Sequence, residues 1–158
     1  GLLGDDQARL RHDRSKGIDM ANTAGICTSF KAELPIEGHN LNSDSIKAAL
    51  YLTTATVGPS TTAYSSTNEV SSANYTAGGA AVTNGTVATS GTTAYWTPAA
   101  NLSWSNVTIT TDCALFYNTS NSNKAICSCT FSTQTVTAGN FTLTMPTNDA
   151  SNALIRIN

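Results

Sequence analysis

Charge is the scarcest property of this sequence. Only 11% of its 158 residues are Asp, Glu, Lys or Arg, against about 25% in a typical soluble domain. Eight of the 18 charged residues lie within residues 1–20, which leaves ten for the other 138. The formal net charge of −2 argues against nucleic acid as the main partner, because phosphate binding needs clustered Lys and Arg. A body so poor in charge suits packing among copies of itself or against a partner, and it also suits an ordinary Thr-rich β-domain.

Long apolar runs and catalytic motifs are also lacking. No stretch reaches 18 apolar residues, so neither a transmembrane helix nor a membrane partner is expected. His12 and His39 belong to no recognisable metal pair, and H-E-x-x-H, G-x-S-x-G and phosphate-binding loops do not occur. Glu69, Asp112 and Asp149 are far apart in the sequence and are interpreted as turn and edge carboxylates. We therefore expect no enzyme, no cofactor and no metal site.

The four cysteines do not form a recognisable framework. Neither zinc nor redox C-x-x-C spacing occurs among Cys27, Cys113, Cys127 and Cys129. Cys127 and Cys129 are two residues apart, which would place both on one face of a strand. Buried reduced thiols are the expectation, with a disulfide between Cys113 and one of that pair as the alternative.

Residues 1–19 form a charged segment without an apolar face. Its few apolar side chains are scattered among charges, so we interpret the segment as an extended N-terminal arm or a disordered leader. On the arm hypothesis, its basic residues are candidate partner-binding residues, namely Arg9, Arg11, Arg14 and Lys16.

Residues 20–45 predict a helix followed by a loop. Ile26, Phe30 and Leu34 recur at four-residue intervals, which indicates a helix over residues 22–34. Pro35 is expected to stop this helix, and the polar residues after it are typical of a loop.

From residue 46 the apolar period changes to two, which is typical of strands. In "IKAALYLTT", apolar residues recur at every second position, which predicts a strand. A second, short strand is expected near residues 69–75, and Asn84-Gly85 is a hairpin signal. "DCALFYN" and "KAICSCTF" flank an Asn- and Ser-rich turn, and "TVTAGNFTLTM" predicts two strand pieces joined at residues 138–140. The fold class is therefore mostly β: a β-sandwich or jelly roll of about seven to nine strands over residues 46–158, preceded by one short helix and the arm.

Aromatic residues gather in "AYWTPAANLSW". Tyr95, Trp96 and Trp104 are candidates for a protein or carbohydrate interface, because Trp and Tyr are common there. The alternative is that one or both Trp side chains fill the core. Tyr95 and Trp96 are kept as candidate partner-binding residues.

From Met20 onward the chain resembles small structural proteins of tailed bacteriophages. The resemblance rests on patterns spread over nearly all of residues 20–158: "MANTAGICTSFKAEL", "IKAALYLTTAT", "TTAYSSTNEVSSANYTAGG", "DCALFYN", "NKAI", "TVTAGNFTLTMPT" and "SNALIRI". These are strand and turn patterns rather than catalytic motifs, and residues 1–19 lie outside them.

The resemblance implies a virion component, assembled in the host cytoplasm and located in the particle. We expect a capsid decoration (cement) protein that binds the major capsid protein or other virion proteins, as a homo-oligomer such as a trimer. The alternative is a tail fibre or receptor-binding tail module that engages cell-surface glycans through Tyr95, Trp96 or Trp104. A cell-wall or glycan hydrolase is a third and weaker hypothesis.

Overall fold

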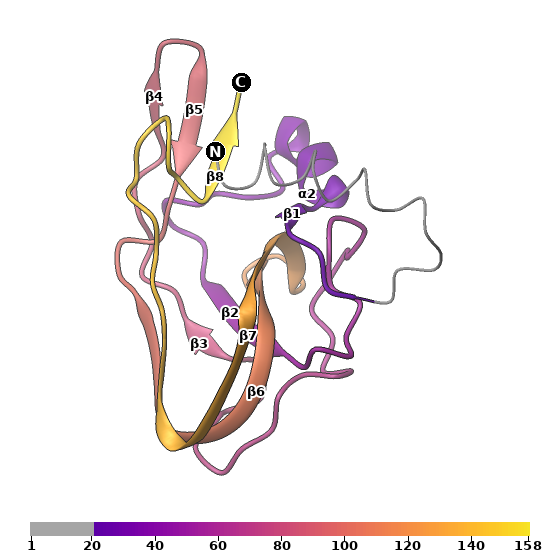
Figure 1. The fold of residues 1–158 in the computed structure, drawn as a ribbon. Helices are drawn as coiled ribbons and strands as arrows, with labels where there is room; N and C mark the ends of the chain where they lie inside the picture. The colour runs from indigo at the N-terminus through magenta and orange to yellow at the C-terminus, as the bar shows by residue number, and fades with distance from the viewer. Residues whose placement is uncertain (1–20) are drawn as a thin grey trace.

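The chain folds into two antiparallel sheets, as seen in a computed structural model that describes residues 21–158 (Figure 1). The larger sheet has the order β1 (Gly25–Ile26), β7 (Lys124–Leu143), β6 (Leu102–Asn118), β2 (Ile46–Tyr51) and β3 (Ala80–Ala81). The smaller sheet has the order β4 (Ala88–Ser90), β5 (Thr93–Trp96) and β8 (Ile155–Ile157). The mostly β prediction is confirmed, with eight strands in the described part. A sandwich or jelly-roll arrangement stays a prediction.

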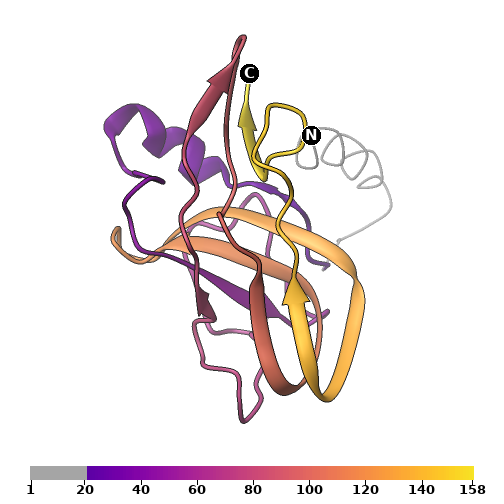
Figure 2. The same cartoon turned by 90° about the vertical axis from the view of Figure 1, so that its left-hand side faces the viewer.

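A long, bent ribbon of β6 and β7 forms the largest part of the five-stranded sheet. The two strands pair from Leu102 opposite Leu143 to Asn118 opposite Lys124, with several register shifts between. Figures 1 and 2 show the ribbon turning back at its lower end and rising toward β5 and β8. Because bulges bend a strand and increase its twist, these register shifts account for the curvature. The expected turn between β6 and β7 is confirmed.

The helix is shorter than the sequence pattern predicts. Instead of covering residues 22–34, α2 spans Thr28–Glu33 and continues as the 3-10 helix η2 over Leu34–Ile36. Gly25 and Ile26 pair with β7, and this ladder occupies backbone groups that a helix would have used. The α-helix ends at Glu33, before Pro35, as expected, and Pro35 fits at the start of η2 because its missing N–H would have no helical partner there.

Two other local predictions are wrong. Asn84-Gly85 does not form a hairpin: a Cβ on Gly85 would lie 1.8 Å from the carbonyl oxygen of Thr97, so this glycine permits a close approach of two segments. The hairpin turn lies instead between β4 and β5, where Gly91 has φ 57°. The expected strand over residues 69–75 is reduced to isolated bridges at Glu69 and Ser72.

Strand β7 is continuous where two pieces were expected. It runs unbroken through residues 138–140, where Ala138 adopts φ 45° and the pairing with β6 shifts. Such a bulge increases the local twist of the strand, and pairing with the neighbouring strand resumes after it. Phe141 and Leu143, beyond this bulge, are both buried.

One apolar core draws on the whole described chain. Phe30 and Cys27, which precede β2, are buried in the same cluster as Leu115 and Ile126 of the central ribbon. The segment predicted as helix and loop therefore shares its core with the β body. All four cysteines are buried and free, as expected. The segment of residues 1–19 lies outside the described residues. No helix within residues 21–158 has the length and hydropathy needed to span a membrane.

Candidate functional site: an apolar groove beside helix α2

A groove of about 610 Å³ lies between the smaller sheet and the segment from α2 to Asn42. In Figure 1, β8 and α2 both lie at the upper end of the molecule. Ligand-binding clefts commonly measure 300–1,000 Å³ and are lined mainly by apolar side chains with a few polar groups. The groove has this character, and we take it as the candidate functional site.

The sheet forms one apolar wall of the groove. Ala94 lies opposite Ile157, and Trp96 lies opposite Ile155 in the ladder between β5 and β8. Because alternate residues of a strand face the same side, these four side chains share one face of the sheet, and all four line the groove. Trp96 is only 1% exposed, and its indole N–H donates to the carbonyl oxygen of Gly85 at 3.2 Å. Trp96 is therefore a fixed part of the groove floor.

The opposite wall comes from α2, η2 and the loop that follows. Phe30 and Leu41 are buried, whereas Leu34 is half-buried and packs against the core. The side chains at positions 30 and 34 share a face because they are one helical turn apart. The residues of this wall thus pack against the hydrophobic core on one side and line the groove on the other.

Two of the three most exposed large apolar side chains of residues 21–158 line this groove. Ile36, Val87 and Ile157 are 74%, 41% and 40% exposed, respectively. Val87 and Ile157 line the groove, while Ile36 lies between the lining residues Leu34 and Glu37 in the sequence. Exposed apolar side chains that cluster on one surface commonly mark a binding site.

The rim of the groove carries an unpaired carboxylate. Glu37 is exposed and forms no ion pair with any of residues 21–158. It follows η2 in a left-handed conformation, with φ 57°. Among residues 21–158, no Lys or Arg lines the groove. The groove is therefore apolar inside and negative at its rim.

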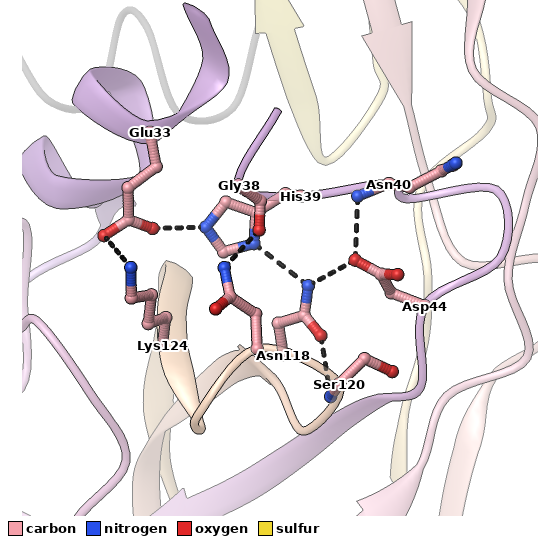
Figure 3. A network of polar contacts seen from close by, with 9 residues as sticks. Glu33, Gly38, His39, Asn40, Asp44, Asn118, Ser120 and Lys124 are labelled. Atoms are coloured by element: carbon pink, nitrogen blue, oxygen red, sulfur yellow. Dashed lines mark hydrogen bonds and ion pairs between the residues drawn. The ribbon is translucent and has the colours of Figure 1, made fainter. Parts of the chain in front are cut away.

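A buried polar network supports the wall formed by α2 and its loop (Figure 3). The Nε2 atom of His39 lies 2.5 Å from a carboxylate oxygen of Glu33, and the Nζ atom of Lys124 lies 3.5 Å from the other oxygen. Asn118, at the end of β6, donates to Nδ1 of His39 at 3.1 Å and to Asp44 at 2.6 Å. The network thus connects α2 to the β6–β7 turn.

This network selects one form of the His39 side chain. The amide oxygen of Asn118 accepts from the backbone N–H of Ser120 at 2.9 Å, so its NH₂ group must face His39 and Asp44. Nδ1 of His39 is then an acceptor, and Nε2 carries the proton donated to Glu33. The imidazole is also fully buried against the ring of Phe30, at a centroid distance of 4.8 Å. No cluster in the described part of the chain has the three or more ligands that would suggest a metal site.

A second polar centre surrounds the buried side chain of Glu69. Its carboxylate accepts from the hydroxyls of Tyr64 and Tyr75, at 2.6 and 2.7 Å, and from the N–H of Gly78 at 2.8 Å. Burial and then the charge of Glu69 raise the pKa of Tyr117 to about 12. Glu69 was expected to be a turn or edge carboxylate. This expectation is wrong, because Glu69 is buried and its hydrogen bonds hold the segment of residues 64–78 together.

The cysteine thiols are unsuited to nucleophilic chemistry. Burial, together with the charge of Glu33, raises the pKa of Cys27 to about 12, and burial raises the pKa of Cys129 to about 12. The pKa values of Cys113 and Cys127 are also raised, again chiefly by burial. Because the thiolate is the reactive form, these residues are structural.

The structure places two of the sequence-predicted site residues at the groove. Tyr95 is half-buried, and Trp96 forms the floor. Trp104 is only 6% exposed, so both Trp side chains are core residues and neither presents an open stacking surface for a glycan. The remaining predicted residues lie outside the described residues: Arg9, Arg11, Arg14 and Lys16.

Sequence reasoning missed the residues that give the groove its character. Val87 and Ile157 carried no signal, because single apolar residues in polar stretches look like ordinary surface or edge positions. His39 was noted only as a loop histidine. The sharpest available signal was the contrast between these apolar residues and their polar neighbours.

Comparison with protein-family models, with curated proteins and with solved structures finds no significant match for this chain. The functional interpretation therefore rests on the groove and on the chemistry of its residues.

Proposed function

We propose that the protein is a structural component of a bacteriophage particle, most specifically a capsid decoration protein that binds and stabilises the head shell. The face that carries the groove is its attachment surface. The observation that supports this proposal is the exposure of Val87 and Ile157 in one groove of a body that is otherwise polar and poor in charge. An apolar patch on such a body favours a lasting protein contact over a transient one.

The electrostatics of the body are consistent with dense packing. Residues 21–158 carry four basic and six acidic side chains, a net charge of −2. Copies placed side by side would repel one another only weakly, and few charges would need to lose their hydration. A protein that binds the assembled shell more tightly than its dispersed subunits stabilises the shell by mass action.

Quantitative mass spectrometry of purified particles tests this function. A decoration protein is expected at a copy number close to that of the major shell protein. The variant Val87→Asp should lower its occupancy on the particle at least tenfold, since a carboxylate in the apolar groove would lose its hydration on binding. Heating the particles should release their genome at a lower temperature when occupancy falls.

Thr92→Asp is the matched control, because Thr92 is exposed at the tip of the β4–β5 hairpin and does not line the groove. It adds the same charge and should leave occupancy unchanged. Circular dichroism should show both variants folded. A copy number of tens or fewer would instead favour a tail component, and absence from the particle would overturn the proposal.

A further inference from the structure

We propose that the groove binds the segment around Leu10 of the same copy of the chain. Leu10 occupies the apolar interior, and Arg9 and Arg11 lie against the negative rim. The proposal concerns the purified protein, in which no shell is present; on a particle, the shell and this segment would compete for the same groove. It therefore does not depend on the virion role.

The groove requires an occupant with two properties. Its interior exposes Val87 and Ile157, so the occupant must supply an apolar side chain. Its rim presents Glu37 without an ion pair in residues 21–158, so a basic side chain next to the apolar one is favoured. An Arg guanidinium is well suited to this position, because it pairs with carboxylates in a bidentate manner and is weakly hydrated.

The sequence "ARLR" at residues 8–11 has this chemistry. Leu10 is the only large apolar residue between Gly4 and Gly17, and a basic residue stands on each side of it. Residues 7–16 contain four basic residues and one acidic residue, a net charge of +3. They are thus complementary to a body of net charge −2.

The connecting chain is long enough for the segment to reach the groove. Ten residues lie between Leu10 and Ala21 in the sequence, and they can span up to about 36 Å when extended. A domain of this size has a radius of gyration of about 14 Å. Attachment to the same polypeptide also raises the local concentration of the segment, so weak contacts suffice for high occupancy.

Photo-crosslinking of the full-length chain tests the proposal. Leu10 is replaced by the photoreactive amino acid p-benzoylphenylalanine, and the crosslinked peptides are identified by mass spectrometry. The expected adducts fall in residues 30–42, 87–96 or 155–157, which form the groove. The same photoreactive residue at position 5 is the control, and its adducts should not concentrate in those ranges. The crosslinked band should keep the mass of a single chain, whereas a band of doubled mass would show that a neighbouring copy supplies the segment and would overturn the proposal.

Variants of the groove make the test specific. Val87→Asp should lower the groove adducts at least fivefold, and Glu37→Gln should lower them about two- to threefold and weaken their dependence on salt. Thr92→Asp, on the same hairpin but outside the groove, should leave the yield unchanged. A synthetic peptide of residues 7–16 should compete with the crosslink, whereas the same peptide with Leu10→Asp should not.

Adducts spread evenly over the surface would overturn the proposal, as would a yield that Val87→Asp and Thr92→Asp change equally. Because the experiment uses purified protein without particles, its failure would leave the copy-number test of the virion role intact.

Discussion

Asn118 donates a hydrogen bond from its amide nitrogen to Nδ1 of His39 at 3.1 Å, and this contact fixes the imidazole as the Nε2–H tautomer. The bond joins the end of β6 to the loop that forms one wall of the groove. Since the same NH₂ group also donates to Asp44, Asn118 cannot turn around without losing both bonds and the one from Ser120.

Replacing Asn118 by Asp should destabilise the protein by about 2–4 kcal/mol. The substitution keeps the shape of the side chain but puts an acceptor opposite Nδ1 of His39 and a like charge near Asp44. Urea denaturation measures the loss, and ¹⁵N NMR of the unaltered protein should show His39 protonated at Nε2 alone.

Asn101→Asp is the control for this substitution. Asn101 is exposed and accepts a hydrogen bond from Met145 at 2.8 Å through its side-chain oxygen, a role that Asp retains. Its effect should stay within about 0.5 kcal/mol. Equal effects of the two variants, or a proton on Nδ1 of His39, would contradict the deduced network.

Removing the carboxylate of Glu69 should be more harmful than neutralising it. Glu69→Ala leaves two tyrosine hydroxyls and the N–H of Gly78 without their acceptor, at a cost of about 3 kcal/mol or more. Glu69→Gln keeps one acceptor oxygen and offers an NH₂ group to the hydroxyl of Tyr64, so it should cost about 1 kcal/mol. Urea midpoints separate the two variants, and indistinguishable midpoints would show that the hydrogen bonds contribute little.

Two glycines should respond very differently to alanine. Gly85→Ala would place Cβ 1.8 Å from the carbonyl oxygen of Thr97, so backbone must move and we expect a loss of about 3 kcal/mol or more. A Cβ added at Gly91 would have no atom within 4 Å, so only the φ of 57° is unfavourable for alanine at this position. Its cost should be about 1 kcal/mol. Thermal denaturation of both variants checks this order, which the reverse ranking would refute.

Stability should fall as the pH rises above about 9. The pKa of Cys27 is raised in the folded state from its ordinary value of 9.0 to about 12, and that of Cys129 rises to about 12 as well. The unfolded chain then loses these protons first, so the stabilisation present below pH 9 is lost between pH 9 and about 12. Urea midpoints at pH 8, 9 and 10 measure the decline.

Cys27→Ala should reduce the steepness of this decline, because one of the buried thiols is gone. In the unaltered protein at pH 8, a thiol reagent such as 5,5′-dithiobis(2-nitrobenzoic acid) should label none of the thiols until urea unfolds the chain. Rapid labelling of the folded protein would show that the thiols are accessible.

Period-two patterning determined much of this protein from sequence alone. The alternation in "DCALFYN" and "KAICSCTF" predicted the central β6–β7 hairpin, because strands that bury a face repeat every two residues whatever their partners are. The burial of the cysteines and the mostly β class follow from the same local regularity.

Long-range contacts decided the rest. Ile26 has helical spacing from Phe30, yet it lies in β1 because its backbone pairs with Cys127, about a hundred residues away in the sequence. Gly85 looks like a hairpin residue, but the approach of Thr97 gives it another role. The groove also belongs to this class: Leu34, Val87 and Ile157 line it from three distant segments, and no local pattern encodes their meeting. Tertiary pairing and packing can override local propensity, because local propensity is weak. The strands could therefore be predicted from the sequence, whereas the site could not.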